Sequence, residues 1–361
     1  MAPVINVFKK DRVNFKTLVA VTAQHREMLD QVLSVFDIIP DYDLDLMSKS
    51  QTLESLTGKI LNGISRLLIQ IQPDLIFVQG DTTTTFSASL AAFYQKIPVG
   101  HIEAGLRTND IYSPFPEEIN RRMTSSIASH HFSPTRQAEQ CLLDEGVNKE
   151  KITVIGNTVI DASLTVSRKV ESDSSEYEEY FLNKYGISFN EKKTILVTGH
   201  RRESFGQGFE NICDAIKNIA TNNDVQVIYP VHLNPNVQDP VNRILCDINN
   251  VYLIPPQDYV PFVFLMKKAD IILTDSGGVQ EEAPSLGKPV LVMRDTTERS
   301  EGVDAGTAKL VGTDKQTIIF QVESLLKDKK EYDKMVKAVN PYGDGKASEI
   351  IYNYISNIFH N

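Results

Sequence analysis

The 361-residue sequence has few cysteines, no long apolar run and no excess of positive charge. The three cysteines, Cys141, Cys213 and Cys246, lie far apart without a C-x-x-C pair, which argues against a zinc site or a disulfide framework and predicts buried free thiols. No apolar segment approaches the roughly 20 residues of a membrane span, and the opening residues lack the apolar core of a signal peptide. We therefore expect a cytoplasmic protein with no membrane partner.

The charge balance limits the class of ligand. The formal net charge is −10, whereas non-specific binding of nucleic acid needs a basic face, so nucleic acid is not an expected partner. An acidic protein still binds an anionic small molecule where arginines, lysines, histidines and backbone N–H groups gather locally. The length of the chain predicts two domains, each with its own core.

Short runs rich in β-branched residues alternate with stretches of helical spacing, which predicts βαβ units and parallel sheets. In the first half, helices are expected over 25–36 and 82–95. The predicted strands of the first half are KTLVAVTA, PDLIFVQGD, PVGHIEAG, HHFSPT and KITVIGN. The predicted strands of the second half are KTILVTGH, VQVIYPVH, VYLIPP, ADIILTDSGG, KPVLVMRD and AKLVGT.

An acidic, polar stretch interrupts this alternation, and two similar α/β halves are expected to join near residues 157–182. The terminal segment 345–361 has the spacing of an amphipathic helix. The apolar side chains that give this helix a wide face are Ile350, Ile351, Tyr354, Ile355, Ile358 and Phe359.

Ligands of open parallel sheets bind at the carboxyl ends of strands, and one such end reads TDSGG. Ser276, Gly277 and Gly278 would let backbone N–H groups at a helix start approach an anion, although a tight turn with positive φ is the alternative explanation. The stretch has neither the lysine of a Walker loop nor a G-x-G-x-x-G pattern. Glu282 lies about one and two-thirds turns along the helix, where it can bind a ribose diol or face solvent.

A second strand end carries cations. His200, Arg201 and Arg202 directly follow KTILVTG, and this combination suits a diphosphate, with a basic surface loop as the alternative. Arg299 is a further candidate partner for an anion. His25 and His232 also end strands, and His130 and His131 are expected to be structural. No group of residues has convincing metal spacing, so no metal site is predicted.

Carboxylates end two strands of the first half. Asp81 and Glu103 follow successive strands, and carboxylates in one site can have their pKa values driven apart to give an acid and a base. Glu117 and Glu118 open a helix, where an acidic residue is also explained as a partner of the helix dipole. This pattern predicts proton transfer at a sugar carbon.

The motifs HIEAGLRT, PFPEEINR, GHRRESFG and TDSGGVQEEAPSLGKPVLVMRDTTER, together with QGDTTTTF, closely resemble those of the bacterial non-hydrolysing UDP-N-acetylglucosamine 2-epimerases along the whole chain. The resemblance implies two Rossmann-like domains in the glycosyltransferase-B-type fold with the active site in the interdomain cleft. The expected domains are 1–162, completed by the terminal helix 343–361, and 163–342. The family is usually homodimeric.

The resemblance also implies roles for single residues. Asp81, Glu103 and Glu117 match the acid/base carboxylates, and His200 matches an essential histidine near the diphosphate. The UDP-binding positions would be Arg201, Ser276, Gly277, Gly278, Glu282 and Arg299. In the family's reaction, UDP-N-acetylglucosamine loses its C2 proton while UDP leaves by anti elimination. UDP then adds back to the 2-acetamidoglucal to give UDP-N-acetylmannosamine, a precursor of cell-surface polysaccharides.

The chain departs from the family pattern in two places. The family's first strand, with its Gly-Thr-Arg-Pro-Glu loop, is missing ahead of MAPVINVFKK, which resembles the later part of the following helix, and this predicts low activity for the chain as given. A regulatory site for a second UDP-N-acetylglucosamine is expected to be weakened, because Glu27 and Ser50 stand where glutamine and arginine are usual. The other segments resembling that site contain Gln24, His25, Arg26, Gln51, Glu118, Arg202 and His232.

Three other functions remain open for this sequence. A glycosyltransferase of the same fold would consume a UDP-sugar only when an acceptor is present. A hydrolysing epimerase would release UDP and free N-acetylmannosamine irreversibly, and a non-catalytic protein would bind the UDP-sugar without turnover.

Overall fold

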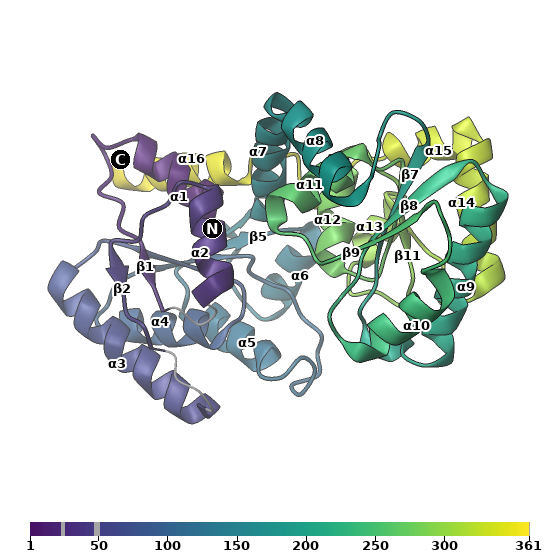
Figure 1. The fold of residues 1–361 in the computed structure, drawn as a ribbon. Helices are drawn as coiled ribbons and strands as arrows, with labels where there is room; N and C mark the ends of the chain where they lie inside the picture. The colour runs from purple at the N-terminus through teal and green to yellow at the C-terminus, as the bar shows by residue number, and fades with distance from the viewer. Residues whose placement is uncertain (23–25, 47–50, 361) are drawn as a thin grey trace. The chain divides into compact units, whose positions relative to one another are not determined.

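The computed structural model describes residues 1–22, 26–46 and 51–360 (Figure 1). The chain forms two compact units, which we call unit 1 (Met1–Ala162 with Tyr342–Asn361) and unit 2 (Ser163–Pro341). Each unit alternates strands with helices, and every strand pair that the described residues form is parallel. The predicted α/β class is confirmed.

Unit 1 contains short parallel strands with helices between them. Its elements are α1 (Ala2–Lys10), β1 (Ala20–Val21), α2 (Arg26–Val35), β2 (Tyr42–Asp43), α3 (Leu53–Ile71), β3 (Ile76–Gln79), α4 (Thr83–Tyr94), β4 (Val99–Ile102), α5 (Glu117–Ile127), β5 (His130–Ser133), α6 (Arg136–Asp144), η1 (Lys149–Lys151), β6 (Ile152–Val154), the start of α7 (Thr158–Ser172), and α16 (Ala347–His360).

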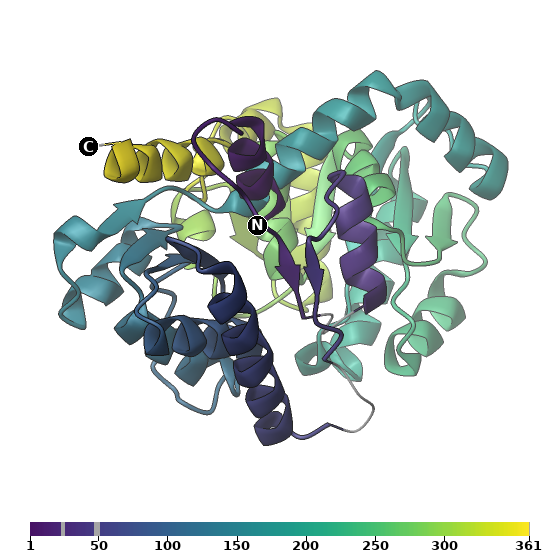
Figure 2. The same cartoon turned by 90° about the vertical axis from the view of Figure 1, so that its left-hand side faces the viewer.

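The described strands of unit 1 form two separate sheets. Strands β3, β4, β5 and β6 lie in sequence order, with Ile76 opposite Val99 at the start of the β3–β4 ladder. Strands β1 and β2 form a two-stranded sheet of their own, seen as a pair of short arrows in Figure 2. The strand predicted over 16–23 is therefore too long, because only Ala20 and Val21 find partners in β2.

The terminal helix α16 belongs to the core of unit 1. Ile351 and Ile355 are buried with Phe8 of α1, and α16 lies beside α1 in Figure 1. Asp161 accepts the N–H groups of Ala347 and Ser348 at 3.3 and 2.8 Å and so caps the first turn of α16. The predicted helix is confirmed.

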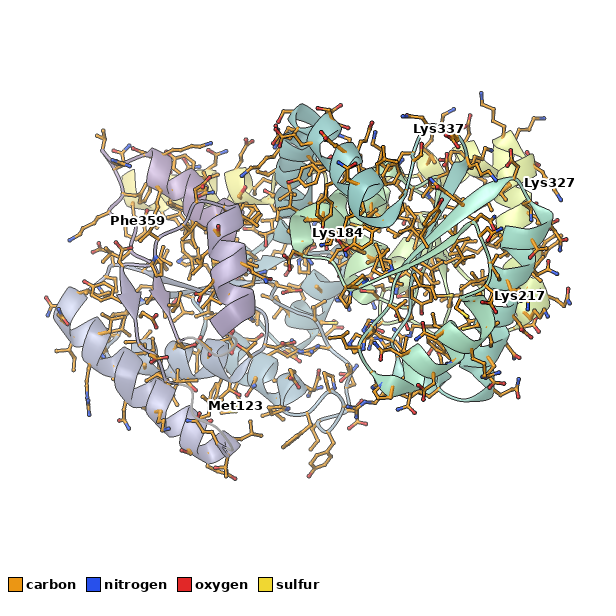
Figure 3. The ribbon with its side chains drawn as sticks, in the orientation of Figure 1. Met123, Lys184, Lys217, Lys327, Lys337 and Phe359 are labelled. Atoms are coloured by element: carbon orange, nitrogen blue, oxygen red, sulfur yellow. The ribbon has the colours of Figure 1, made fainter. Side chains whose placement is uncertain are left out.

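The apolar face of α16 is only partly covered. Ile358 and Phe359 are 44 % and 46 % exposed, and Phe359 is labelled near the end of the helix in Figure 3. Burial of α16 against unit 1 therefore rests on its first three turns.

Unit 2 is built around a larger parallel sheet than either sheet of unit 1. Its elements are the end of α7, α8 (Ser174–Tyr185), β7 (Lys193–Thr198), η2 (Arg202–Ser204), α9 (Gln207–Asn222), β8 (Val225–Pro230), α10 (Pro235–Leu245), β9 (Val251–Ile254), α11 (Tyr259–Lys268), β10 (Ile271–Thr274), α12 (Gly277–Ser285), β11 (Val290–Val292), α13 (Ser300–Asp304), β12 (Ala308–Leu310), α14 (Lys315–Lys327) and α15 (Lys329–Val336). The polar stretch near 157–182 forms the helices α7 and α8.

The six strands of unit 2 form a parallel sheet in the order β12-β11-β10-β7-β8-β9. This order runs outward in both directions from the neighbouring strands β7 and β10, which makes their carboxyl ends the topological switch point of the sheet. Ile195 and Leu273 are completely buried in the core beneath this edge. The sheet order therefore brings the segments after β7 and β10 side by side.

The outer helices of unit 2 have polar faces. The side chains of Lys327 and Lys337 are 66 % and 75 % exposed, each pairing with a carboxylate four residues earlier, and Figure 3 labels both at the surface of α14 and α15. Such exposed pairs contribute little stability. None of the helices within the described ranges combines the length and apolar character needed to cross a bilayer.

Candidate active site

The TDSGG segment begins a helix at the switch point of unit 2. Strand β10 ends at Thr274, Ser276 is the N-cap residue and Gly277 is the first residue of α12. Neither Gly277 nor Gly278 has a positive φ, so the alternative of a tight left-handed turn is wrong. A Cβ on Gly277 would lie 3.2 Å from Oε1 of Glu298, so the missing side chain leaves room for a close approach to the helix start.

The loop after β7 is fastened to the end of β10. Oδ2 of the buried Asp275 accepts the backbone N–H groups of His200 and Arg201 at 2.6 and 2.7 Å. The imidazole of His200 is partly exposed and lies flat against His232, with ring centroids 5.4 Å apart and an interplanar angle of 19°. Two of the predicted histidines therefore share one strand edge.

The arginines at this edge are paired with glutamates. Arg201 lies 3.4 Å from Glu298, and Arg299 lies 2.5 Å from the buried Glu281. Glu298 also accepts from Arg294 at 2.6 Å. A bound diphosphate would compete with Glu298 for these cations. Sequence reasoning missed both residues, although Arg294 directly precedes the DTTER loop that contributes Arg299 and Glu298 lies within that loop.

Glu282 is held by a tyrosine from α11. The hydroxyl of Tyr259 donates to Oε2 of Glu282 at 2.8 Å. Burial raises the pKa of Glu282 to about 7, which places its ionisation in the neutral range. A Cβ on Gly278 would lie 3.7 Å from Oε1 of Glu282, so the carboxylate and the helix start are close neighbours.

In unit 1, Asp81 and Glu103 follow β3 and β4, which are neighbours in the sheet. A Cβ on Gly80 would lie 3.4 Å from Oε2 of Glu103, so this carboxylate points back over the end of β3. Glu103 has a φ of +64°, a left-handed conformation that costs a residue with a side chain energy and is commonest at functional sites. The structure thus gathers the two carboxylates at one strand edge.

Asp81 is partly buried beside the charged side chains of Arg121 and Glu117. Burial raises its pKa, the negative charge of Glu117 adds to the rise, and the guanidinium of Arg121 opposes it. Nδ2 of Asn120 donates to the carbonyl of Asp81 at 2.9 Å and fixes the backbone. Because Glu117 is the first residue of α5, the start of that helix meets the end of β3.

His101 is a residue that sequence reasoning missed. It is completely buried in β4, and its Nε2 donates to the carbonyl of Gly80 at 2.8 Å. Burial lowers its pKa to about 4, so the ring is neutral and supports the backbone just before Asp81. Its place in the motif HIEAG, two residues before Glu103, was the signal available in the sequence.

The carboxylate of Glu118 is hydrogen-bonded within unit 1. Its buried carboxylate accepts the N–H groups of Thr108 and Asn109 and the Nε of Arg122. Burial opposes ionisation, but the hydrogen bonds from Thr108 and Arg122 lower the pKa of Glu118. This residue therefore fastens the loop before α5, while its predicted contact with a regulatory ligand stays a prediction.

The remaining regulatory positions are divided between the units. Gln24, His25 and Ser50 lie outside the described residues, and of Arg26 only the backbone, at the start of α2, is described. Gln51 donates to the carbonyl of Leu46 at 3.4 Å. In unit 2, Arg202 is an exposed residue of η2, and His232 contacts His200.

Two histidines and the three cysteines were expected to have structural roles only. His130 and His131 lie in β5, His131 is buried, and His130 is 3.1 Å from the hydroxyl of Tyr354. The three cysteines are free, but only Cys213 is buried; Cys141 is intermediate and Cys246 is exposed. The prediction of buried thiols is therefore confirmed for Cys213 and wrong for Cys141 and for Cys246, which follows the last residue of α10.

Comparisons with known proteins show the family to which the chain belongs. The family model described as UDP-N-acetylglucosamine 2-epimerase matches residues 8–356. The chain is 58 % identical over 358 residues to a UDP-N-acetylglucosamine 2-epimerase of Escherichia coli (strain K12), covering 99 % of this chain and 95 % of the relative.

Solved structures agree as well. A UDP-GlcNAc 2-epimerase from Neisseria meningitidis bound to UDP-GlcNAc has a TM-score of 0.87 at 50 % identity, covering 99 % of this chain and 96 % of that one. A UDP-GlcNAc 2-epimerase from Methanocaldococcus jannaschii, in complex with UDP-GlcNAc and UDP, has a TM-score of 0.76 at 34 % identity, with 99 % and 95 % covered.

Proposed function

Because the chain belongs to the UDP-N-acetylglucosamine 2-epimerase family, we propose that it interconverts UDP-N-acetylglucosamine and UDP-N-acetylmannosamine. The observation that carries this proposal is the switch point of unit 2, where His200, Ser276 and Gly277 meet at the carboxyl ends of β7 and β10. A helix start beside a histidine and two arginines has the chemistry of a diphosphate site. No bound cofactor is needed for the reaction.

The nucleotide is held by residues of unit 2 in this proposal. The N–H groups at the start of α12 and the side chains of Arg201 and Arg299 bind the phosphates, since each carries positive charge or an available donor. Glu282 binds the ribose hydroxyls. His200 meets the diphosphate oxygen that gains charge when the C1–O bond breaks.

The carboxylates of unit 1 carry out the proton transfers in this proposal. One carboxylate removes the C2 proton, the C2 electron pair forms the C1=C2 double bond, and the C1–O bond electrons leave with UDP. In the return step the UDP oxygen attacks C1 and a proton is delivered to C2 on the opposite face. Asp81, Glu103 and Glu117 supply these groups, and the raised pKa of Asp81 suits a group that exchanges a proton.

The proposal is tested by incubating the protein with UDP-N-acetylglucosamine in D₂O and recording proton NMR spectra. Appearance of UDP-N-acetylmannosamine with deuterium at C2 is the expected result. UDP-sugar consumption only on addition of an acceptor would show a glycosyltransferase. Irreversible release of UDP and N-acetylmannosamine would show a hydrolysing enzyme, and binding without turnover would show a UDP-sugar-binding protein.

We also propose that the enzyme works in the cytoplasm as a homodimer and supplies precursors of cell-surface polysaccharides. Exposed apolar side chains on three neighbouring helices of unit 1 support self-association. They are Ile69 of α3, Phe93 and Tyr94 of α4, and Ile119 and Met123 of α5, of which Met123 is labelled in Figure 3. Light scattering coupled to size exclusion is expected to give about twice the monomer mass.

The domain limits remain a proposal of the same kind. We propose that residues 1–162 with 343–361 and residues 163–342 are the folding domains. Limited proteolysis followed by mass spectrometry of the fragments tests these limits.

A further inference from the structure

Asp275 is a buried carboxylate just after β10 that contacts two residues of the proposed diphosphate site. Its Oδ2 accepts the backbone N–H groups of both His200 and Arg201. These two hydrogen bonds fix the backbone that carries the imidazole. Asp275 therefore determines where the His200 side chain starts.

The second oxygen of Asp275 faces the imidazole itself. Its Oδ1 lies 3.3 Å from Nδ1 of His200 and makes no hydrogen bond among the described residues. Burial opposes ionisation of Asp275, but the hydrogen bonds from His200 and Arg201 lower its pKa, so the group is a carboxylate that only accepts. A buried acceptor is costly when unpaired, which favours a hydrogen on the facing Nδ1.

The stacked ring of His232 restricts the orientation of the His200 imidazole. Nδ1 of His232 accepts the backbone N–H of Asn234 at 3.1 Å, so the hydrogen of the neutral His232 ring is on Nε2. Its stacked contact with His200 restricts rotation of the imidazole about its side-chain bonds. Stacking on His232 thus sets the plane of the His200 ring, and Asp275 sets which ring nitrogen faces the protein.

We propose that Asp275 is a positioning residue that holds the Nδ1–H of His200 and leaves Nε2 to meet the diphosphate. This inference rests on the proposed function and adds to it a residue that never touches the substrate. With Nδ1 occupied, Nε2 is the only ring atom available to a ligand. A protonated ring then donates its Nε2–H to the leaving diphosphate oxygen without reorienting during the reaction.

Asp275→Asn tests the role of the carboxylate with little change of volume. The amide oxygen can still accept the two backbone N–H groups, but its NH₂ group then faces Nδ1 and forces the hydrogen of His200 to Nε2. The amide no longer stabilises the imidazolium form of His200, so the ring that meets the diphosphate is neutral and its Nε2–H is a weaker donor and acid; loss of the carboxylate from another His–Asp pair, in which the histidine acts as a base, lowers kcat by orders of magnitude. We expect kcat to fall by about 10² to 10⁴-fold, with KM changed by less than about threefold.

Asp270→Asn is the matched control. Asp270 lies just before the same strand, at the opposite end from Asp275, and its Oδ2 accepts the backbone N–H of Thr194 at 2.7 Å. Asp270→Asn therefore removes one negative charge, as Asp275→Asn does, and the amide oxygen can still accept a hydrogen bond from the backbone. We expect its kcat to stay within about twofold of the wild type.

The tautomer is measured directly by long-range ¹H–¹⁵N NMR of histidine-labelled protein at about pH 8, above the usual titration range of imidazole. His200→Gln identifies the His200 signals. The wild type is expected to show hydrogen on Nδ1 and Asp275→Asn to show it on Nε2. A wild-type His200 with hydrogen on Nε2 overturns the proposal, even where the Asn variant fails to fold.

Equal loss of activity in the Asp275→Asn and Asp270→Asn variants would also overturn it, because both losses would then be structural. The NMR result is independent of turnover. Absence of epimerisation in the wild type would therefore reject the proposed function while leaving the assignment of the tautomer standing.

Discussion

The guanidinium of Arg121 lies 2.7 Å from Oδ2 of Asp81 and 3.6 Å from Oε2 of Glu118. One buried cation thus contacts both a proposed catalytic carboxylate and a carboxylate that fastens the neighbouring loop. Since burial and Glu117 raise the pKa of Asp81, Arg121 limits how far the pKa rises. In the proposed reaction, the pH at which Asp81 exchanges its proton depends on this balance.

Removal of the cation should move the pH dependence of the reaction. Arg121→Gln is expected to raise the pKa of Asp81 further, by about one unit, because the attraction to the charged form is lost. Whichever limb of the pH–kcat profile Asp81 governs should therefore move to higher pH. Arg122→Gln is the control, since Arg122 pairs with Glu118 at 2.9 Å. A profile that shifts equally in both variants would contradict the assignment.

Glu103 should show opposite effects on stability and activity. Its left-handed backbone costs about 1 kcal/mol, which Glu103→Gly removes together with the carboxylate. We expect a free energy of unfolding that is unchanged or higher by up to about 1 kcal/mol, and a kcat lower by at least about 100-fold. Chemical denaturation and the epimerase assay measure the two quantities.

The control for Glu103 is Gln72→Gly at the end of α3. Gln72 is exposed and has a φ of +45°, so its substitution relieves the same kind of strain outside the site. It is expected to change stability similarly and to leave kcat unaltered. If Glu103→Gly markedly destabilises the protein and Gln72→Gly does not, the side chain of Glu103 stabilises the fold, and the strain at this position is not explained by the reaction.

Glu282 should make the unliganded protein less stable as the pH rises. Its pKa is about 7 in the folded protein and near 4.5 in the unfolded chain, so the folded state binds more protons between these values. The contribution of protonated Glu282 to the free energy of unfolding is fully present below about pH 4.5. It is lost as the pH rises from there through 7. Glu282→Gln removes this loss and should stabilise the protein at pH 8 by about 1 to 3 kcal/mol.

The measurement for Glu282 is urea denaturation of both proteins at pH 5 and pH 8 without ligand. The stabilising effect of Glu282→Gln is expected to shrink toward pH 5, where the wild-type group is already protonated. Glu281→Gln is a useful contrast, because Glu281 pairs with Arg299 and its loss should destabilise the protein. A pH-independent difference between wild type and Glu282→Gln would exclude the raised pKa.

The strand ends that hold the candidate site were predictable from local sequence. Asp81 and Glu103 in unit 1, and His200 and Ser276 in unit 2, each follow an apolar, β-branched run, and parallel strands bring such ends to one edge of the sheet within each unit. The contact of Asp275 with His200 was not predictable, because it depends on the pairing of β7 with β10 across 75 residues of chain. No spacing within either segment reveals which oxygen faces the imidazole.

Glu118 and Glu298 illustrate a second limit of sequence reasoning. The position of Glu118 at a helix start predicts a ligand contact or a dipole partner, and nothing in the sequence distinguishes Glu298 from other loop residues. In the structure each carboxylate accepts hydrogen bonds from nearby donors, Glu118 from a loop backbone and Glu298 from Arg294. Such partners come from loops whose path is set by packing, so they appear only when the fold is known.

The two glycines of α12 should differ in their tolerance of a methyl group. A Cβ on Gly277 would lie 3.2 Å from Oε1 of Glu298, whereas the nearest atom to a Cβ on Gly278 is 3.7 Å away. Gly277→Ala must therefore displace Glu298, the partner of Arg201 and Arg294, and narrow the approach to the helix start. We expect UDP to bind about tenfold more weakly to Gly277→Ala, a loss of about 1.4 kcal/mol, and to be affected less by Gly278→Ala.

Isothermal titration with UDP compares the two glycine variants, and thermal unfolding serves as the control for folding. Alanine has a better helix propensity than glycine by about 1 kcal/mol, so neither variant should lose much stability. Equal affinities in the two variants would show that the space beside Gly277 is not used by the nucleotide. A selective loss in Gly277→Ala would instead place the phosphates against the first turn of α12, because only there does the added methyl group meet the Glu298 carboxylate.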